Sequence, residues 1–181
     1  MPSRAVRLRA LAHPLRWKLL DLLESGGPAT ATECARASGE SVASCAYHLG
    51  ILGKYGYLER APAVGRERPW RLAERRQDLS ATGGAQERRA AAAATDAFLA
   101  HELERIASWT RRRADEPAPW REATGLGGST VWATAEELAA LREELLARLT
   151  RFAPRDADPG ARPPGAREAR LFFALVLRPP P

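Results

Sequence analysis

The chain of 181 residues carries a formal net charge of +6 and is 45% hydrophobic. That apolar content can support a buried core, and the length suits one domain with an extension or two small domains. Two cysteines do not make a disulfide framework, and the longest apolar run, residues 171–177, is far too short to span a bilayer. No basic segment followed by an apolar one opens the sequence, so we expect a cytoplasmic protein without a membrane partner.

The basic surplus is concentrated in the first 80 residues. They hold 13 Lys+Arg against 8 Asp+Glu, whereas residues 81–181 hold 15 against 14. Positive charge of this kind supports nucleic-acid binding by the amino-terminal part of the chain.

Two helices are expected before residue 30. Residues 4–11 can form a helical lead-in, and Pro14 fits the first turn of a second helix. The apolar residues of that second helix are Leu15, Leu19, Leu20, Leu22 and Leu23. We expect His13 to cap or solvate its start, and Trp17, near its outer face, to pack against another element; neither is given a chemical role.

Residues 30–58 contain two short helical patterns that meet at Gly39, the arrangement of a helix-turn-helix. Thr30 or Thr32 can cap the first helix, whose inward side is expected to carry Cys34, Ala35 and Ala37. Ser41 is a good N-cap for the second helix, in which Cys45, Leu49 and Leu52 form one inward stripe. Both cysteines are therefore expected to serve as small core residues.

The opposite side of the second helix is expected to face outward. It carries Val42, Ala43, Ser44, Ala46, Tyr47 and His48. Small and hydrogen-bonding side chains near a helix N-terminus suit a helix that enters the major groove of DNA. Ser44, Tyr47 and His48 are the candidates for contacts with base edges or nearby phosphates.

Residues 57–72 read as strand, glycine-centred turn and strand, because apolar residues alternate on both arms. Such a hairpin directly after a helix-turn-helix is a wing. Of its arginines, Arg66 and Arg68 lie beside Gly65 at the tip, where they can reach phosphates, and Lys54 can do so from the end of the preceding helix. The alternative is a solvated hairpin with scattered charge.

The segment from about residue 5 to 75 resembles the winged helix-turn-helix of the ArsR-like bacterial transcription regulators. The matching residues are Leu11, Ala12, Pro14 and Arg16, followed by His48, Leu49, Leu52, Gly56 and Leu58, in the expected order and spacing. The resemblance implies a DNA-binding repressor or activator that works as a homodimer. The metal-sensing branch of that family carries a Cys-x-Cys pair before the turn, where this chain has Cys34 alone, so no metal is expected.

A polar linker at 77–86 leads to one long expected helix, residues 87–113. Its apolar residues at helical spacing include Leu99, Leu103 and Ile106, and Phe98 and Trp109 widen the apolar face beyond what a solvated helix needs. In the resembling family the C-terminal helix commonly pairs with its counterpart, so Phe98, Leu99, Leu103 and Ile106 are the candidate dimerisation residues. The alternative is that this helix packs only within its own chain.

Residues 117–181 are expected to form a small α/β module. Val131 and Trp132 suggest a short strand, and Thr134 begins a capping box before a helix. The inner stripe of that helix is expected to be Leu138, Leu141, Leu145, Leu149 and Phe152. The apolar run at 171–177 suits a buried strand. The module could bind a small effector, which the sequence does not identify.

An enzymatic function is not expected. The loop at 125–130, GLGGST, follows no apolar strand and lacks the lysine of a phosphate-binding loop, and His13, His48 and His101 have no metal-ligand spacing. The sequence thus predicts a mainly α protein with a small β component and no cofactor. Residues 1–76 would be a winged helix-turn-helix domain, 77–116 a linker and long dimerisation helix, and 117–181 the C-terminal module. The expected function is transcription regulation on double-stranded DNA as a homodimer; the alternative is a winged-helix protein-interaction module.

Overall fold

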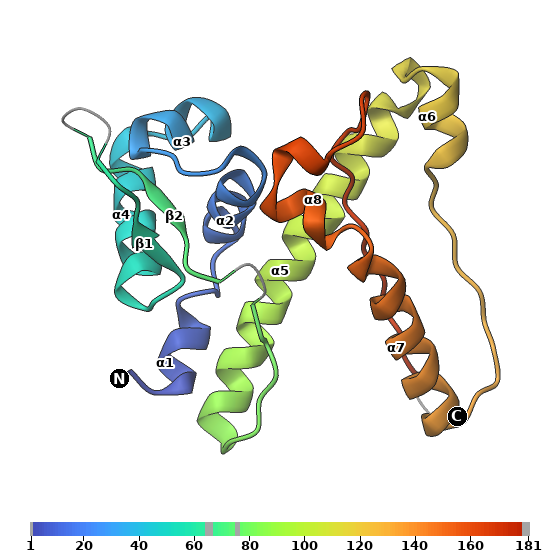
Figure 1. The fold of residues 1–181 in the computed structure, drawn as a ribbon. Coiled ribbons are helices and arrows are strands. Elements are labelled where there is room, and N and C mark those ends of the chain that lie inside the picture. Colours follow the sequence, from blue (N-terminus) through green and yellow to red (C-terminus); the bar gives the residue numbers. More distant parts are fainter. Residues whose placement is uncertain (1, 64–66, 75–76, 179–181) are drawn as a thin grey trace. The chain divides into compact units, whose positions relative to one another are not determined.

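A computed structural model describes residues 2–63, 67–74 and 77–178 (Figure 1). It is mainly helical, with a small two-stranded antiparallel sheet, and divides into two compact units, 1–116 and 117–181. The first unit contains α1 (Arg4–Arg9), α2 (Pro14–Gly26), α3 (Ala31–Ser38), α4 (Val42–Lys54), β1 (Leu58–Arg60), β2 (Trp70–Leu72), α5 (Ala85–Arg112) and the 3-10 turn η1 (Arg113–Asp115).

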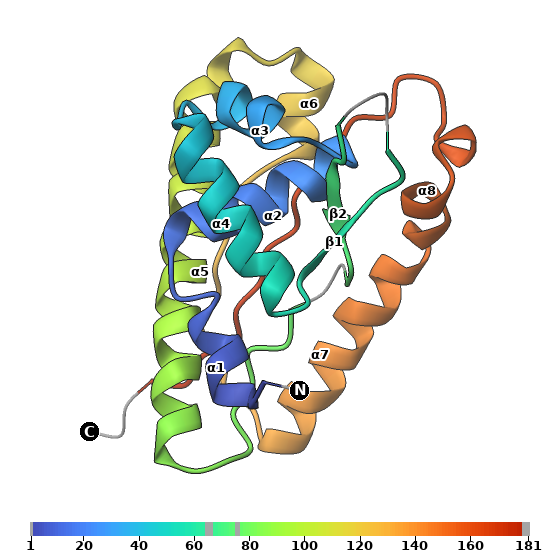
Figure 2. The same cartoon turned by 90° about the vertical axis from the view of Figure 1, so that its left-hand side faces the viewer.

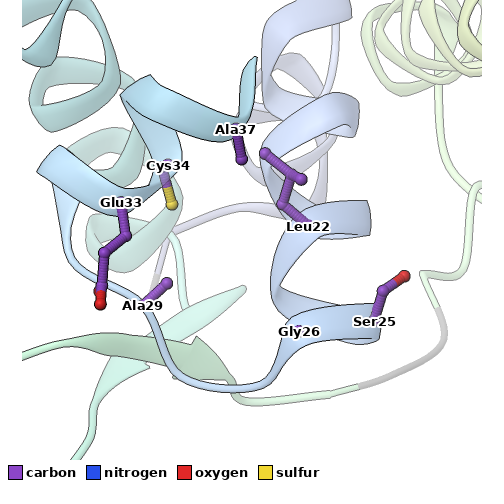
Figure 3. Close-up of a pocket in the computed structure, with 7 residues that line it drawn as sticks. All are labelled: Leu22, Ser25, Gly26, Ala29, Glu33, Cys34 and Ala37. Carbon is purple, nitrogen blue, oxygen red and sulfur yellow. The ribbon is translucent and has the colours of Figure 1, made fainter. Parts of the chain in front are cut away.

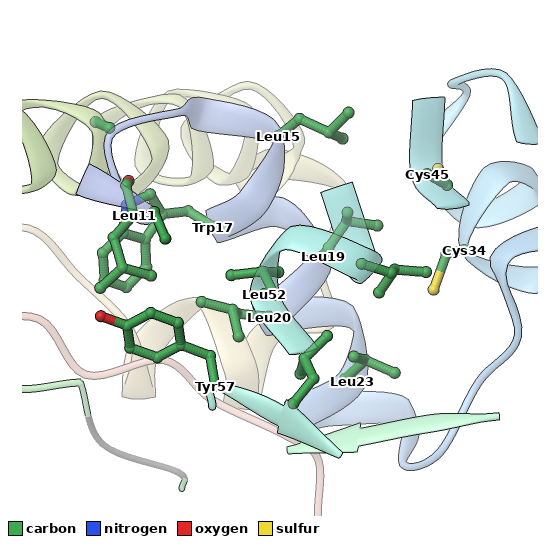
Figure 4. Close-up of a cluster of buried hydrophobic side chains, with 14 of the residues drawn as sticks. Leu11, Leu15, Trp17, Leu19, Leu20, Leu23, Cys34, Cys45, Leu52 and Tyr57 are labelled. Atoms are coloured by element: carbon green, nitrogen blue, oxygen red, sulfur yellow. The ribbon is translucent and has the colours of Figure 1, made fainter. Parts of the chain in front are cut away.

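The core of the first unit is built around α2, which contacts α3, α4, α5 and β2. Leu19 of α2 and Leu52 of α4 are fully buried (Figure 4), and so is Leu49 of α4. His13 caps α2, as expected, because its Nδ1 accepts a hydrogen bond from the backbone N–H of Leu15 at 3.2 Å. Burial of such leucine side chains contributes about 1.5–3 kcal/mol each, so α2 organises the whole unit.

The long helix α5 forms close to its expected bounds and packs within its own unit, against α1 and α2 (Figure 2). Its buried side is a run of alanines, Ala90, Ala91, Ala94 and Ala97, whose small side chains let the helices approach closely. The expected linker before it is tied down, since Arg4 of α1 forms an ion pair with Asp78 at 2.6 Å. Neither α5 nor any other helix among the described residues is long and apolar enough to cross a bilayer.

Trp17 and Phe98 correct two sequence-based placements. Trp17 packs against another element, as expected, because Phe98 of α5 covers it with ring centroids 4.9 Å apart; it is therefore buried and does not lie near the outer face of α2. Phe98 is therefore half-buried in its own unit, and it is not part of an outward-facing apolar stripe. The indole N–H of Trp17 also donates to the carbonyl oxygen of Leu11 at 2.8 Å, which satisfies its buried donor.

Local signals set the ends of α3 and α4. Thr30 and Glu33 form a capping box at the start of α3, and Gly39 ends it with a φ of 75°, in the left-handed region that glycine adopts easily. Ser41 then caps α4 by accepting a hydrogen bond from the N–H of Ser44. One placement was wrong: Ala37 is exposed, and Ser38 takes the inward position.

The hairpin is attached to the helices through Trp70. Its strands pair with Leu58 opposite Leu72, and the backbone of Trp70 also exchanges two hydrogen bonds with Ala29, ahead of α3. The Trp70 ring lies against Gly53 of α4 so closely that a Cβ there would come within 2.4 Å of it. The position of the hairpin relative to α4 therefore depends on Gly53 having no side chain.

The second unit differs from the expected α/β module. Its described residues form α6 (Ala118–Ala123), α7 (Ala135–Thr150), α8 (Ala153–Ala157) and the 3-10 turn η2 (Pro159–Ala161), and they contain no strand. Residues 131–132 and 171–177 are exposed and irregular, because a strand requires a partner for its backbone groups and none is formed there. The capping box at Thr134 is present, but no residue of α7 is fully buried.

Two glycines of α4 provide a matched test of this packing. We expect Gly53→Ala to lower the free energy of unfolding by about 1–3 kcal/mol, because the new methyl group overlaps the Trp70 ring. Gly50→Ala meets no atom within 4 Å and should raise the free energy of unfolding by about 0.5–1 kcal/mol through its better helix propensity. Urea denaturation of both variants measures the difference. Equal effects would show that Trp70 does not need the space at Gly53.

Candidate nucleic-acid interface

The outer side of α4 is an exposed strip of small and aromatic side chains. Val42 is 48% exposed and Tyr47 63% exposed, with Ala43 and Ala46 exposed beside them. Ser44 is half-buried, with its backbone N–H bonded to the Ser41 cap. The inward stripe of Cys45, Leu49 and Leu52 is buried as expected and holds this side of the helix outward.

His48 corrects the expectation for this helix, because it is buried at 8% exposure and faces the interior. Its ring lies against His13 with centroids 4.3 Å apart, and the Nε–H of Arg16 donates to its Nδ1 at 3.2 Å. Arg16 also donates to the carbonyl oxygen of Ala10 at 2.8 Å. At +6 from Val42 in a helix, His48 points away from the strip, so it anchors α4 to α2 instead of facing outward.

Both imidazoles in this anchor are held neutral. Burial, followed by the Arg16 cation, lowers the pKa of His13, and burial, His13 and Arg16 lower the pKa of His48. Glu40 opposes both shifts. Each ring accepts a hydrogen bond at Nδ1, from Leu15 or Arg16, so each proton resides on Nε2. Protonation of either ring would place a donor against a donor and add charge beside Arg16.

The arginines of the hairpin differ in their environment. Arg60 stacks on the Trp70 ring, 3.7 Å from its centroid, and donates to the backbone carbonyl of Arg68. Arg71 is paired with Glu59 at 2.8 Å, so its charge is largely offset. Arg68 is exposed, and Arg66 lies outside the described residues. The described hairpin therefore presents Arg68 as its candidate phosphate contact, on a backbone held by Arg60.

Other basic residues lie around α3 and α4. Lys54 is exposed at the end of α4, with its Nζ 5.5 Å from the centroid of the Tyr55 ring. Lys18 instead donates to the carbonyl oxygen of Ser38 at 2.7 Å, which satisfies a terminal acceptor of α3. Arg36 of α3 is exposed and was not among the candidate contact residues predicted from the sequence. It is a cation on the first helix of the expected helix-turn-helix, and that position could have identified it.

The positioning role of Gly53 and Trp70 was also missed. A glycine inside a helical pattern that has no turn to make is a sequence signal of close packing. That signal identifies Gly53 as unusual but does not reveal which ring occupies the space. The contact joins residues 17 positions apart, and only the folded hairpin brings them together.

The candidate dimerisation residues lie in three environments. Leu99 and Leu103 are exposed on α5, at 38% and 61%, while Ile106 is half-buried. Phe98 belongs to the core with Trp17. An apolar strip, defined by the exposed Leu99 and Leu103 and the half-buried Ile106, thus remains on the side of α5 away from its alanine face.

A shallow cavity of about 350 Å³ lies between α2 and α3 (Figure 3). Leu22, Cys34 and Ala37 point into it, and Glu33 and Ser25 lie at its edge. Burial, with Cys45 and Glu33 nearby, raises the pKa of the Cys34 thiol to about 11, so the thiol is protonated at neutral pH. Within the described residues, no group of three His, Cys, Asp or Glu side chains is arranged to hold a metal ion.

The described surface of the first unit combines two chemical features. The α4 strip offers apolar and hydroxyl groups, and the cations Lys54, Arg36 and Arg68 lie on α4, α3 and the hairpin that adjoin it. Such a combination suits a polymer with an anionic backbone and partly apolar edges. Neither family models nor curated proteins gave a match to the chain.

The neutral imidazole pair predicts a loss of stability in acid. Because the folded-state pKa of both histidines is lowered, the unfolded chain binds more protons as the pH falls below about 6.5. The stabilisation is therefore complete above that pH and decreases below it. Urea denaturation at pH 7.5, 6.5 and 5.5 measures this slope.

His13→Asn provides the control for this prediction. Asparagine is a good N-cap that does not titrate, so the variant should stay within about 1 kcal/mol of the parent at pH 7.5. It should lose less stability than the parent between pH 7.5 and 5.5, because one of the two rings with a lowered pKa is absent. An identical pH slope in the two proteins would exclude the His13–His48 pair as its source.

Proposed function

We propose that this protein is a transcription regulator that binds double-stranded DNA through a winged helix-turn-helix and acts as a homodimer without catalysis. In this proposal α3 and α4 are the helix-turn-helix, α4 is the recognition helix, and the β1–β2 hairpin is the wing. The exposed residues expected to contact DNA are Val42, Ala43, Tyr47, Lys54 and Arg68, with the half-buried Ser44 at their edge. Arg66 lies outside the described residues and remains a candidate phosphate contact on the basis of the sequence alone.

The attachment of the hairpin to α4 is the observation that carries the proposal. Trp70 packs on Gly53, pairs with Ala29 and supports Arg60, so its contacts hold strand β2 against α4. A helix that fits a groove and has a basic hairpin packed beside it supports simultaneous contact with a groove and the adjacent backbone. The basic surplus of the first 80 residues agrees with that role.

The exposed strip on α5 supports the homodimer. Leu99 and Leu103 lie on a helix whose opposite side is already packed, so they have no role in the core of the first unit. Two copies joined through this strip would hold two recognition helices at a fixed separation. Dimeric regulators of this class read half-sites about 34–36 Å apart, which requires such a scaffold.

A protein-interaction module is the second candidate. The observation that favours it is the apolar character of the α4 strip, which bears Val42 and Tyr47 and no charge before Lys54. Exposed apolar residues are common at protein interfaces. The two functions differ in salt dependence, because only an anionic polymer releases condensed counterions on binding.

Salt dependence tests DNA binding directly. If a dimer neutralises about 6–10 phosphates, the logarithm of the affinity for duplex DNA should fall with log salt at a slope of about −5 to −9. Arg68→Ala and Lys54→Ala should each make the slope shallower by about 1 for every phosphate that is no longer neutralised. Fluorescence anisotropy of a labelled random duplex, titrated at several salt concentrations, gives these slopes.

Arg89→Ala is the matched control for these variants. Arg89 is an exposed arginine of α5, whose helical contacts in the first unit are with α1 and α2. Its removal changes the net charge equally but should leave the slope unchanged. Failure of the parent protein to bind duplex DNA would favour the interaction module, and equal slopes for all proteins would remove Arg68 and Lys54 from the interface.

Assembly is tested by placing a charge in the α5 strip. Leu103→Glu would bury an unpaired carboxylate in the dimer interface, so the dimer should dissociate and DNA affinity should fall sharply. Ala93→Glu, at an exposed alanine about two turns before Leu99, should leave the dimer intact. Analytical ultracentrifugation gives the mass of each species. A folded Leu103→Glu protein that stays dimeric would move the interface elsewhere, most reasonably to α7.

A further inference from the structure

The α4 strip has an unusual composition. From Ser41 to Gly53 the helix contains no charged and no amide side chain, and its one imidazole, His48, is buried. The exposed members are Ser41, Val42, Ala43, Ala46 and Tyr47. The nearest charges on this segment of chain are Glu40, ahead of the cap, and Lys54, at the last turn.

Each base presents different chemistry in the major groove. Guanine is bound by Arg or Lys, adenine by Asn or Gln, and cytosine by Asp or Glu, whereas thymine offers a C5 methyl group to apolar side chains. The α4 strip lacks the first three kinds of side chain and contains the fourth. A hydroxyl such as that of Tyr47 both donates and accepts, so it discriminates weakly among bases.

The geometry of α4 places the apolar side chains where base edges are read. Val42 and Ala43 lie in the first turn, and Ala46 follows one turn later on the same side. The N-terminal residues of a recognition helix are the ones that contact base edges. Tyr47 lies edge-on to the buried His48 ring, with centroids 5.1 Å apart and an interplanar angle of 79°. This contact limits the orientations of the Tyr47 ring.

We propose that this protein discriminates its DNA sites through the C5 methyl groups of thymine, which Val42, Ala43 and Ala46 contact in the major groove. The inference rests on the proposed function and names the chemical group of DNA that the protein would recognise. Hydrogen bonds from Ser44 and Tyr47 then orient the helix, and Lys54, Arg36 and Arg68 hold it on the backbone. Sites should therefore be rich in thymine on the strand that faces the first two turns of α4.

The test begins with the full chain and a random duplex library, from which preferred sites are selected. Each thymine in a selected site is then replaced by uracil, which keeps base pairing and removes only the methyl group. Loss of a buried methyl group costs about 0.8 kcal/mol, or about fourfold in affinity, at each thymine that is read. Thymines that the protein does not touch should show no change.

A second substitution separates the methyl group from the rest of the base. Where uracil weakens binding, a change from the T·A pair to a 5-methylcytosine·G pair should retain more affinity than a change to an unmodified C·G pair. The methyl group then occupies the same place in the groove while the hydrogen-bonding pattern changes. Equal affinity for the methylated and unmethylated C·G pairs would overturn the proposal.

Variants of the protein assign the contact. Val42→Ala removes two exposed methyl groups and improves helix propensity, so it should fold normally and reduce the uracil effect at one thymine position. Lys54→Ala should weaken thymine and uracil sites by the same factor, because a phosphate contact carries no base information. An unchanged uracil effect in Val42→Ala would remove Val42 from the contact.

The outcomes distinguish this inference from the function on which it rests. If the parent protein shows salt-dependent DNA binding but binds uracil sites as tightly as thymine sites, the methyl-reading proposal is wrong and the function stands. If Glu40→Gln abolishes a preference for cytosine while uracil has no effect, Glu40 in the turn before α4 discriminates the bases. The proposal for the α4 strip is then wrong. If no duplex is selected at all, the proposed function fails.

Discussion

Burial of the leucine side of α2 is the interaction on which the rest of the first unit depends. This helix contacts α3, α4, α5 and β2, so its core fixes the outward direction of the α4 strip and of α5 together. Leu19, Leu49 and Leu52 are fully buried in the core that α2 and α4 share. Because interiors are close-packed, a shift of α4 relative to α2 would open space that no neighbouring side chain could fill.

Polar contacts then select one arrangement of that core. Arg16 joins the start of α2 to His48 of α4, and Lys18 joins α2 to the end of α3 at Ser38. Each is a directional hydrogen bond at the edge of an apolar interface. Its net contribution to stability is modest, but its geometry restricts how the two helices can be oriented. For the proposed function, the consequence is that the apolar strip of α4 has a defined orientation relative to α2 and α3.

Trp70 does the same for the hairpin. Its backbone pairs with Ala29, the edge of its ring fills the space over Gly53, and Arg60 stacks on the ring. A two-stranded hairpin is marginally stable alone, so these attachments give it a defined position beside α4. In the proposed function, the apolar strip of α4 would discriminate bases and the exposed cations around it would attract the DNA backbone.

The sequence by itself determined the elements of residues 4–112, because caps at Thr30 and Ser41, the Gly39 turn and the leucine spacing are local signals that act within a few residues. It also indicated most of the exposed α4 residues. It failed at His48 and Phe98, because whether these side chains face inward depends on Arg16 and Trp17 in another helix. It failed again at 131–132 and 171–177, since apolar runs become strands only where a partner satisfies their backbone groups. The tertiary structure alone decided the contact of Trp70 with Gly53, because the glycine reveals a space and only the folded hairpin supplies the ring that fills it.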